Sequence, residues 1–160
     1  MNLAIEVSKM YPQDLESIHH TLLKNFDDFW NYEIFKSELA NTNSSYLVAR
    51  EKKGDHFEIV GFAGIKKILD EANLMNIVVR KDKRHQGIAS LLLEHILVLA
   101  KHLNCTSITL EVSVANTNAI SLYQKYHFET KGTRKKYYHN GEDALIMTRT
   151  FSAFTFSLPR

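Results

Sequence analysis

The sequence predicts a single mixed α/β domain in which helices flank a central sheet. Two observations support this fold class. Short segments with strand-like patterns alternate along the chain with longer segments of helical periodicity, and one stretch has the order strand, long helix, strand. A length of 160 residues suits one hydrophobic core. We therefore expect one domain over residues 1–150, followed by a tail at 151–160.

The first half of the chain is expected to contain three strands and two helices. Leu3–Val7 alternates apolar and polar residues, and Pro12 opens a run of apolar residues at helical spacing. A second helix is expected over Glu33–Leu39, after an aromatic loop at Phe26–Tyr32. Tyr46–Arg50 and Phe57–Ile65 then indicate two antiparallel strands around a polar turn.

The second half contains the strand, helix, strand order. Asn73–Val79 predicts a strand, apolar residues from Ile88 to Leu103 recur at helical spacing, and Thr106–Val112 is rich in β-branched residues. Because these strands are too far apart in sequence for a hairpin, we expect them to be parallel with a right-handed crossover. A short helix and two strands complete the chain, at Asn118–Tyr126, Phe128–Arg134 and Ala144–Thr150.

Composition and charge argue against several classes of protein. A hydrophobic fraction of 44% with 24% charged residues is typical of a globular chain and not of a disordered one. A net charge of +2 gives no reason to expect a polyanionic partner. Cys105 is the only cysteine, which excludes an internal disulfide and fits the cytoplasm. No signal peptide or membrane-spanning stretch is recognisable, so we expect a cytoplasmic protein without membrane association.

A turn between the predicted strand at 73–79 and the long helix has the features of an anion site. Its residues are Arg84, His85, Gln86, Gly87, Ile88 and Ala89. A helix N-terminus offers unpaired N–H groups and partial positive charge, and Gly87 allows an anion to approach the backbone closely. Arg84, with Lys83 or Arg80, can add charge. The segment fits neither a P-loop nor a dinucleotide-binding fingerprint. Alternatively, Gly87 serves only to connect a loop to a helix.

The pattern Arg84-x-x-Gly87-x-Ala89, after a strand and before a long helix, resembles the acetyl-CoA signature of the GNAT superfamily of N-acetyltransferases. Within it, residues 3–150 are most similar to the ribosomal-protein alanine N-acetyltransferases of the RimI type. Short strings in the same order carry this narrower resemblance: Asn76–Val79, Leu91–His95, Leu110–Val112, Asn116, Ala119–Tyr123, Tyr137-Tyr138 and Asp143-Ala144.

The resemblance implies the GNAT fold, an α/β (α+β) arrangement whose mixed, mostly antiparallel central sheet is flanked by helices. Its central parallel strand pair is splayed to admit acetyl-CoA. The implied cosubstrate contacts come from the turn at 84–89, from the backbone of Ile77, Val78 and Val79, and from Asn116. Asn116 can otherwise be a helix cap. No metal is expected, because the histidines lack the spacing of ligands.

Glu111 and Tyr123 are the predicted catalytic pair. Strand alternation places Glu111 on the face opposite Leu110 and Val112. Acetyl transfer from a thioester to an amine needs a base for the amine and a proton for the departing thiolate. The resemblance implies that Glu111, acting through water, is the base and that Tyr123 is the acid. The alternatives are a glutamate paired with a lysine or solvent, and a core aromatic.

The expected acceptor is the N-terminal α-amino group of a protein, such as a ribosomal protein. An α-amine, with a pKa of roughly 7.7 to 8.0, is neutral at pH 7 far more often than a lysine amine near 10.4. In related enzymes loop aromatics flank a slot for the acceptor, and here these are Trp30, Tyr32, Tyr137 and Tyr138. The sequence departs from its relatives at three positions that bear on the acceptor: Phe29 stands where proline is usual, Ser113 where arginine is common, and His127 where glycine is usual.

Other functions stay open at this point. The chain can acetylate a small amine such as a polyamine, amino acid or aminoglycoside, or it can bind CoA without catalysis, although the presence of both Glu111 and Tyr123 argues against the latter. Binding to nucleic acid, through Arg134–Lys136 and the neighbouring tyrosines, is the weakest option. We expect a monomer or weak homodimer. The tail Phe151–Leu158 alternates like an edge strand that caps the sheet, pairs with another subunit or is an extension.

Overall fold

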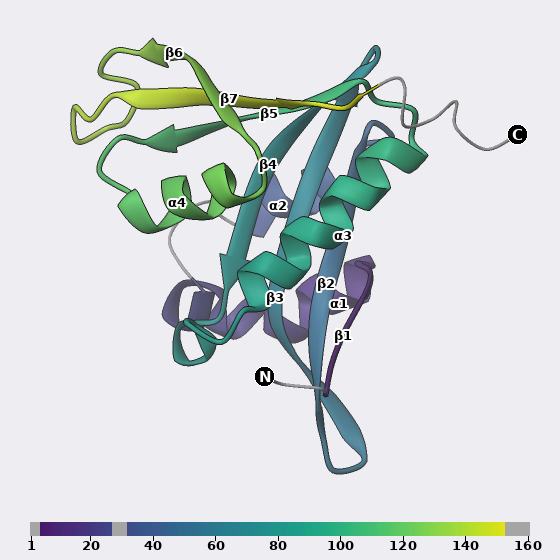
Figure 1. Ribbon diagram of the computed structural model, residues 1–160. Helices are drawn as coiled ribbons and strands as arrows, with labels where there is room; N and C mark the ends of the chain where they lie inside the picture. Colours follow the sequence, from purple (N-terminus) through teal and green to yellow (C-terminus); the bar gives the residue numbers. More distant parts are fainter. Residues whose placement is uncertain (1–3, 27–31, 153–160) are drawn as a thin grey trace, which may run out of the picture. The chain divides into compact units, whose positions relative to one another are not determined.

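A computed structural model describes residues 4–26 and 32–152 of the chain (Figure 1). The chain divides into two compact units: unit 1 comprises Met1–Lys66 and Met75–Leu99, and unit 2 comprises Lys67–Leu74 and Ala100–Arg160. Seven strands are hydrogen-bonded in the order β1-β2-β3-β4-β5-β7-β6, and the sheet is mixed and mostly antiparallel. The predicted fold class, a mixed sheet flanked by helices, is confirmed.

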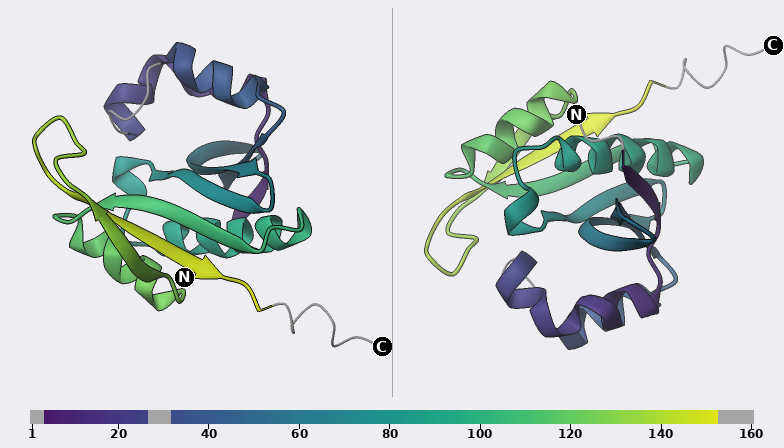
Figure 2. Two further views of the ribbon diagram at one scale, coloured as in Figure 1. Left: turned by 90° about the horizontal axis from the view of Figure 1, so that it is seen from above. Right: turned by 90° about the horizontal axis from the view of Figure 1, so that it is seen from below.

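Unit 1 contains most of the N-terminal elements. They are β1 (Ile5–Lys9), α1 (Pro12–Ile18), α2 (Tyr32–Ala40), β2 (Ser44–Lys53), most of β3 (His56–Ile68), the second part of β4 (Glu71–Val79) and most of α3 (Ile88–His102). Strand β2 pairs antiparallel with both β1 and β3. Within this unit α1 and α2 cover one face of the strands and α3 covers the other (Figure 2). Both faces of these strands are therefore shielded by helices.

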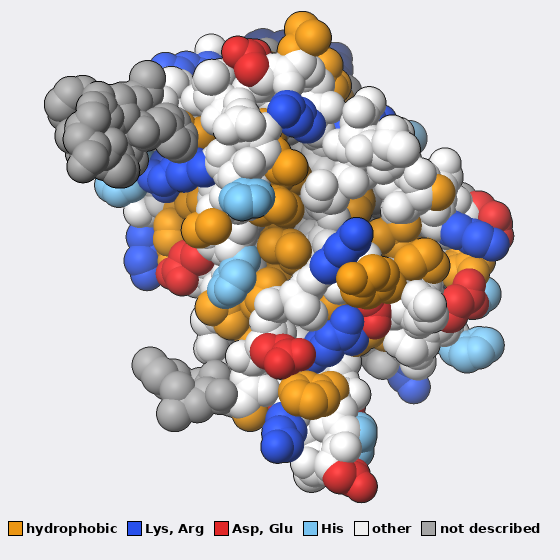
Figure 3. Space-filling model, turned by 90° about the vertical axis from the view of Figure 1, so that its right-hand side faces the viewer, with side chains coloured by type: hydrophobic (Ala, Val, Ile, Leu, Met, Phe, Trp, Pro, Cys, Tyr) orange, Lys and Arg blue, Asp and Glu red, His pale blue; other side chains and the backbone are white. Residues whose placement is uncertain are grey.

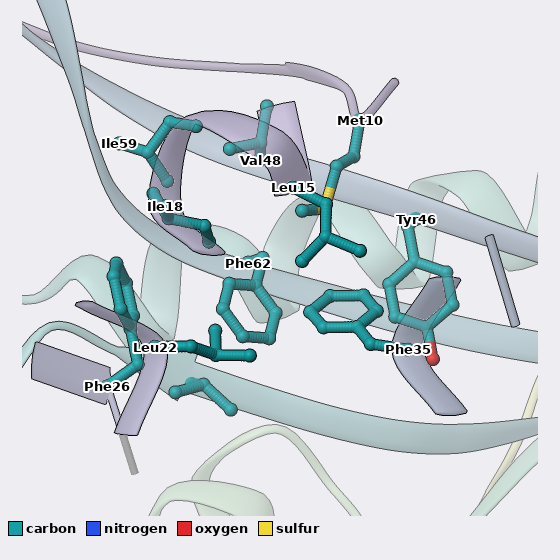
Figure 4. Packing of buried hydrophobic residues seen from close by; sticks show 11 residues of the cluster. Met10, Leu15, Ile18, Leu22, Phe26, Phe35, Tyr46, Val48, Ile59 and Phe62 are labelled. Atoms are coloured by element: carbon teal, nitrogen blue, oxygen red, sulfur yellow. The ribbon is translucent and has the colours of Figure 1, made fainter. Parts of the chain in front are cut away.

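An aromatic and aliphatic cluster fills the space between these strands and the helical segments α1 and α2 (Figure 4). Its buried members are Met10, Leu15, Ile18, Leu22, Phe26, Phe35, Tyr46, Val48, Ile59, Phe62 and Val78. The ring of Phe62 lies 4.9 Å from that of Phe35 and 5.5 Å from that of Phe26, centroid to centroid. Because each large apolar side chain stabilises the fold by about 1.5–3 kcal/mol when buried, this cluster fixes the end of β4 that carries Val78.

Gly61 in β3 allows the start of α3 to pack directly on the strand. A Cβ atom there would lie 2.9 Å from the Val78 carbonyl oxygen and 3.1 Å from Cδ1 of Leu92. Both approaches are too close for a side chain. The absent side chain thus determines where α3 begins relative to β3 and β4 within unit 1.

Unit 2 contains the first part of β4 and the C-terminal elements. These are β5 (Ser107–Ser113), α4 (Thr117–Lys125), β6 (Glu129–Arg134) and β7 (Ala144–Thr150). Strands β4 and β5 are parallel, as predicted, and their ladder contains three pairs, from Glu71 opposite Ser107 to Asn73 opposite Thr109. Strand β7 then pairs antiparallel with both β5 and β6. The parallel ladder is therefore short, while the antiparallel part of unit 2 is extensive.

The predicted elements are all present, with shifted ends. Helix α1 ends at Ile18, and the chain continues as a 3₁₀ turn at His19–Thr21 and a π turn at Leu22–Phe26. The prediction that Phe26 and Tyr32 are loop residues is wrong, because Phe26 ends the π turn in the core and Tyr32 is the first residue of α2. Long ladders also extend β2 and β3 into residues with weak strand propensity.

The chain ends and surface add little to the site. Phe151 is buried and neither it nor Ser152 lies in a strand, while the rest of the tail, 153–160, is outside the described residues.

Positive and negative side chains are interspersed with apolar ones on the face shown in Figure 3. Among the helices that the structure describes, none combines the length and the apolar character needed to span a membrane.

Candidate functional site

The turn between β4 and α3 has the backbone geometry of an anion site. Gly87 has φ +83° and His85 has φ +64°, so both adopt the left-handed conformation that suits glycine best. The Leu91 N–H donates to the Gly87 carbonyl over 3.1 Å, so the first amides of α3, at Ile88 and Ala89, have no acceptor within the helix. No atom would lie within 4 Å of a Cβ atom at Gly87, so the space beside these amides is open.

The basic side chains near this turn are tied to carboxylates or to the backbone. Arg80 donates from Nε to Asp82 over 2.7 Å, and Lys83 lies 2.9 Å from the buried carboxylate of Glu51. These hydrogen bonds raise the pKa of Arg80 and of Lys83. Since acidic partners already neutralise both cations, the expectation that they add charge for an anion loses support. Arg84 is exposed and donates from Nε to the Val79 carbonyl over 3.3 Å.

The end of β4 before this turn contributes backbone and one buried amide. Val78 packs into the core of unit 1, whereas Ile77 and Val79 are partly exposed. Both polar atoms of the Asn76 side chain are buried, and this amide interacts with the Tyr46 hydroxyl. Asn76 belongs to one of the strings that carry the resemblance and was not predicted as a site residue.

In unit 2, Glu111 lies on the exposed face of β5. Its neighbours Leu110 and Val112 are buried, so the predicted alternation is confirmed. Two side chains donate hydrogen bonds to the carboxylate: Nε of Arg134 donates to Oε2, and the Tyr137 hydroxyl donates to Oε1 over 3.1 Å. The partner of Glu111 is thus an arginine and not the lysine considered as an alternative. Arg134 was not among the predicted site residues.

Tyr137 and Tyr138 interact electrostatically with Glu111, and Tyr123 interacts with Tyr138. The rings of Tyr137 and Tyr138 are in edge contact, with centroids 5.0 Å apart. The hydrogen bond to Glu111 raises the pKa of Tyr137, while burial and then the charge of Tyr137 raise that of Tyr138. Burial, followed by the influence of Tyr138, raises the pKa of Tyr123 to about 12. Tyr137 and Tyr138, two of the predicted acceptor residues, thus lie beside Glu111, and Tyr123 is connected to this group only through Tyr138.

Asn116 caps helix α4. Its Oδ1 accepts from the Ala119 N–H over 3.2 Å, and its carbonyl accepts from the Ile120 N–H over 3.0 Å. The capping alternative is therefore observed. Because the cap uses only Oδ1 of the side-chain amide, it does not compete with the predicted cosubstrate contact through Nδ2.

Hydrogen bonds join the connection between β6 and β7 to the end of β5. Ser113 donates from Oγ to Glu142 over 2.6 Å, which lowers the pKa of Glu142. The Val114 N–H donates to the Asp143 carbonyl over 3.0 Å. Ser113, one of the three departures from the related sequences, thus orients the connection that carries Tyr137 and Tyr138.

The remaining predicted acceptor residues belong to another part of the chain. Tyr32 is in unit 1, where its ring stacks on His19 at 3.7 Å between centroids and its hydroxyl donates to Glu16. That hydrogen bond is the main reason why the pKa of Tyr32 rises to about 12. Trp30 and Phe29 lie outside the described residues. In the described part of the chain, no three His, Cys, Asp or Glu side chains gather as metal ligands would.

Comparison with known proteins identifies relatives over most of the chain. Residues 13–128 match the model of the Acetyltransferase (GNAT) family. A Bacillus subtilis protein, provisionally named a [ribosomal protein bS18]-alanine N-acetyltransferase, is 31% identical over 153 residues, which cover 95% of this chain and 99% of that relative. An N-alpha-acetyltransferase of Saccharolobus solfataricus is 39% identical over 93 residues, or 56% of each chain.

The solved structures lead to the same group of proteins. The crystal structure of the ribosomal-protein-S18-alanine N-acetyltransferase from Escherichia coli is similar to this chain with a TM-score of 0.82 at 28% sequence identity. The similarity covers 98% of this chain and 99% of that one. Fold and sequence comparisons therefore agree along nearly the whole length.

Proposed function

Because the chain belongs to the Acetyltransferase (GNAT) family and is an acetyl-CoA-dependent N-acetyltransferase, we propose that its acceptor is the N-terminal α-amino group of a protein. The names of the B. subtilis and E. coli relatives specify the alanine terminus of ribosomal protein bS18, and that of the S. solfataricus relative specifies an α-amine. The observation that carries the chemistry is the presence in unit 2 of an accessible carboxylate, Glu111, and a phenol that stays protonated, Tyr123.

The turn at 84–89 fits the diphosphate of acetyl-CoA. The open space beside Gly87 and the first amides of α3, which have no acceptor within the helix, suit an anion, and Arg84 adds positive charge. We assign the pantetheine arm to backbone groups of residues 77–79, and a further contact to Nδ2 of Asn116. Acetyl-CoA supplies the activated acetyl thioester.

Glu111 and Tyr123 have complementary roles in this reaction. Glu111 takes the proton of the acceptor amine through a water molecule as the new C–N bond forms and the C–S bond breaks. With a pKa of about 12, Tyr123 is a much weaker acid than a simple thiol near 8.5. A full proton transfer from Tyr123 to the thiolate is therefore unfavourable. Tyr123 acts as a hydrogen-bond donor that stabilises the departing thiolate.

The acid–base properties of amines favour an α-amine over a lysine amine as the acceptor. An α-amine loses its proton near pH 8, so a substantial fraction is already neutral at the pH of the cell. The pKa of a lysine amine is about 2–3 units higher than that of an α-amine, so a much smaller fraction of it is neutral at the same pH. This chemistry and the names of the relatives point to the same acceptor class.

A panel of acceptors tests this proposal. Purified protein and acetyl-CoA are incubated with peptides that start with alanine or serine, with the same peptides blocked at the N-terminus, and with spermidine, and release of the CoA thiol is followed. We expect thiol release only with the unblocked peptides, most rapidly with the N-terminal sequence of ribosomal protein bS18. Turnover of spermidine without turnover of any peptide would replace the proposal with a small-amine acetyltransferase.

A further inference from the structure

Both carboxylate oxygens of Glu111 are already engaged within unit 2. Oε2 accepts from Nε of Arg134, and Oε1 accepts from the Tyr137 hydroxyl over 3.1 Å. A glutamate side chain on an open strand face would otherwise sample several rotamers. Two donors on two different oxygens restrict it to one orientation and still leave lone pairs for a third partner, because an ionised carboxylate has about four acceptor positions.

The register of the sheet explains how Arg134 reaches Glu111 from two strands away. Arg134 lies opposite Ala144 in β7, and Ala144 lies opposite Ser113 in β5. Residues opposite one another share a face, so Arg134 projects on the face that carries Ser113 and Glu111. Two interstrand spacings amount to about 10 Å, and Ala144, the β7 residue between Arg134 and Ser113, carries only a methyl group. The guanidinium can therefore extend across β7 to the carboxylate.

A bulge in β6 is what places Arg134 on this face. Thr130 lies opposite Met147, whereas Gly132 lies opposite Ile146, so one residue, Lys131, is inserted into β6. Without this insertion every later side chain of β6 would project to the other face. The bulge thus brings the arginine and the predicted base together, which is a common use of bulges next to active sites.

We propose that Arg134 is a positioning residue for Glu111 and that, together with the Tyr137 hydroxyl, it holds the carboxylate in the orientation that receives the acceptor proton. This inference rests on the proposed function, since it takes Glu111 as the base. The ion pair contributes little to folding, because the Arg134 side chain is 57% exposed and that of Glu111 is 29% exposed. Removing the guanidinium should therefore affect catalysis more than stability.

Kinetics of matched variants test the proposal. R134M removes the charge and the donors but keeps most of the aliphatic stem, R134K keeps the charge, and K135M removes an exposed cation at the next position. With an alanine-starting peptide as acceptor, we expect R134M to lower kcat by about tenfold to a hundredfold with the KM for acetyl-CoA unchanged. R134K should recover part of the loss, and K135M should behave as the unchanged protein.

The double variant R134M/E111Q separates positioning from an independent role. If Arg134 acts through Glu111, R134M causes no further loss in a chain that already carries E111Q. An equal loss in both backgrounds would overturn the proposal. So would an R134M protein that keeps its kcat and binds the acceptor more tightly, because Arg134 would then compete with the acceptor for Glu111. A normal rate for E111Q alone would instead refute Glu111 as the base, a failure of the proposed function.

Discussion

The turn at 84–89 in unit 1 differs in design from the cluster in unit 2 that consists of Glu111, Arg134, Tyr137 and Tyr138. In the turn, the backbone supplies the binding groups, and two nearby cations, Arg80 and Lys83, are neutralised by Asp82 and Glu51. In unit 2, side chains supply the chemistry, and other side chains hold them in place. The turn should therefore be sensitive to backbone conformation, and the cluster to the loss of single polar atoms.

The largest effect is expected in the cluster, from E111Q. This change keeps the size of the side chain but removes the base, so turnover should fall about 10²- to 10⁴-fold. Binding of acetyl-CoA, assigned to the turn, should stay within a factor of about two. Steady-state kinetics and calorimetric titration with acetyl-CoA check the two parts. A parallel loss of acetyl-CoA binding would contradict the assignment of binding to the turn and of proton removal to Glu111.

The next effect is expected in the turn, from G87V. A β-branched residue at φ +83° is strained, and it adds bulk beside the free amides of α3. We expect the KM for acetyl-CoA to rise about tenfold or more, with a smaller change in kcat at saturation. G132V is a control for glycine replacement outside the turn, since a Cβ atom there makes only an ordinary contact of 3.6 Å. An unchanged KM in G87V would remove the turn from cosubstrate binding.

A smaller effect, about tenfold on kcat, is expected from Y123F, and its pH dependence is informative. Because the pKa of Tyr123 is raised to about 12, the phenol keeps its proton throughout the neutral and mildly alkaline range. The ratio of the rates of the unchanged protein and Y123F should therefore be constant from about pH 8 to about pH 11. A ratio that falls with an apparent pKa near 10 or below would show that Tyr123 is not shielded as described.

The raised pKa of Tyr123 also predicts a loss of stability at alkaline pH. In the unfolded chain this phenol titrates near 10, while in the folded chain it titrates at about 12. Its contribution is fully present below pH 10 and is lost as the pH rises through the folded value. Denaturant unfolding at a series of pH values should show a smaller alkaline loss in Y123F than in the unchanged protein.

The smallest effect on activity is expected from K83M. Lys83 is basic and next to Arg84, but its ammonium is paired with Glu51, whose residue is only 6% exposed. We expect an unchanged KM for acetyl-CoA and an unfolding temperature lowered by a few degrees, because a buried carboxylate loses a partner. A raised KM with normal stability would mean that Lys83, and not the backbone, attracts the diphosphate.

The same contrast explains what could be predicted from the sequence. The turn has a pattern at fixed local spacing, Arg84-x-x-Gly87-x-Ala89, and the exposed position of Glu111 follows from strand alternation over three residues. Both are local properties. The parallel pairing of β4 and β5 also follows from chain length and connection, and the structure confirms it.

The contacts of the cluster could not be predicted in this way. Arg134 meets Glu111 only because β7 lies between β5 and β6 and because Lys131 is inserted into β6. No local pattern encodes a strand order or a bulge, so Arg134 seemed merely part of a basic run. Likewise, Lys83 and Glu51 are 32 positions apart in sequence. Because this pair neutralises Lys83, the residue does not add charge for an anion as its place beside Arg84 had suggested.

One measurement tests the acceptor assignment most directly: fragmentation mass spectrometry of a peptide with a free N-terminal alanine and an internal lysine, after incubation with acetyl-CoA and the protein. We expect a single acetyl group on the alanine α-amine, formed by the unchanged protein and nearly absent with E111Q. Acetylation of the lysine, or an alanine product formed equally well by E111Q, would contradict it.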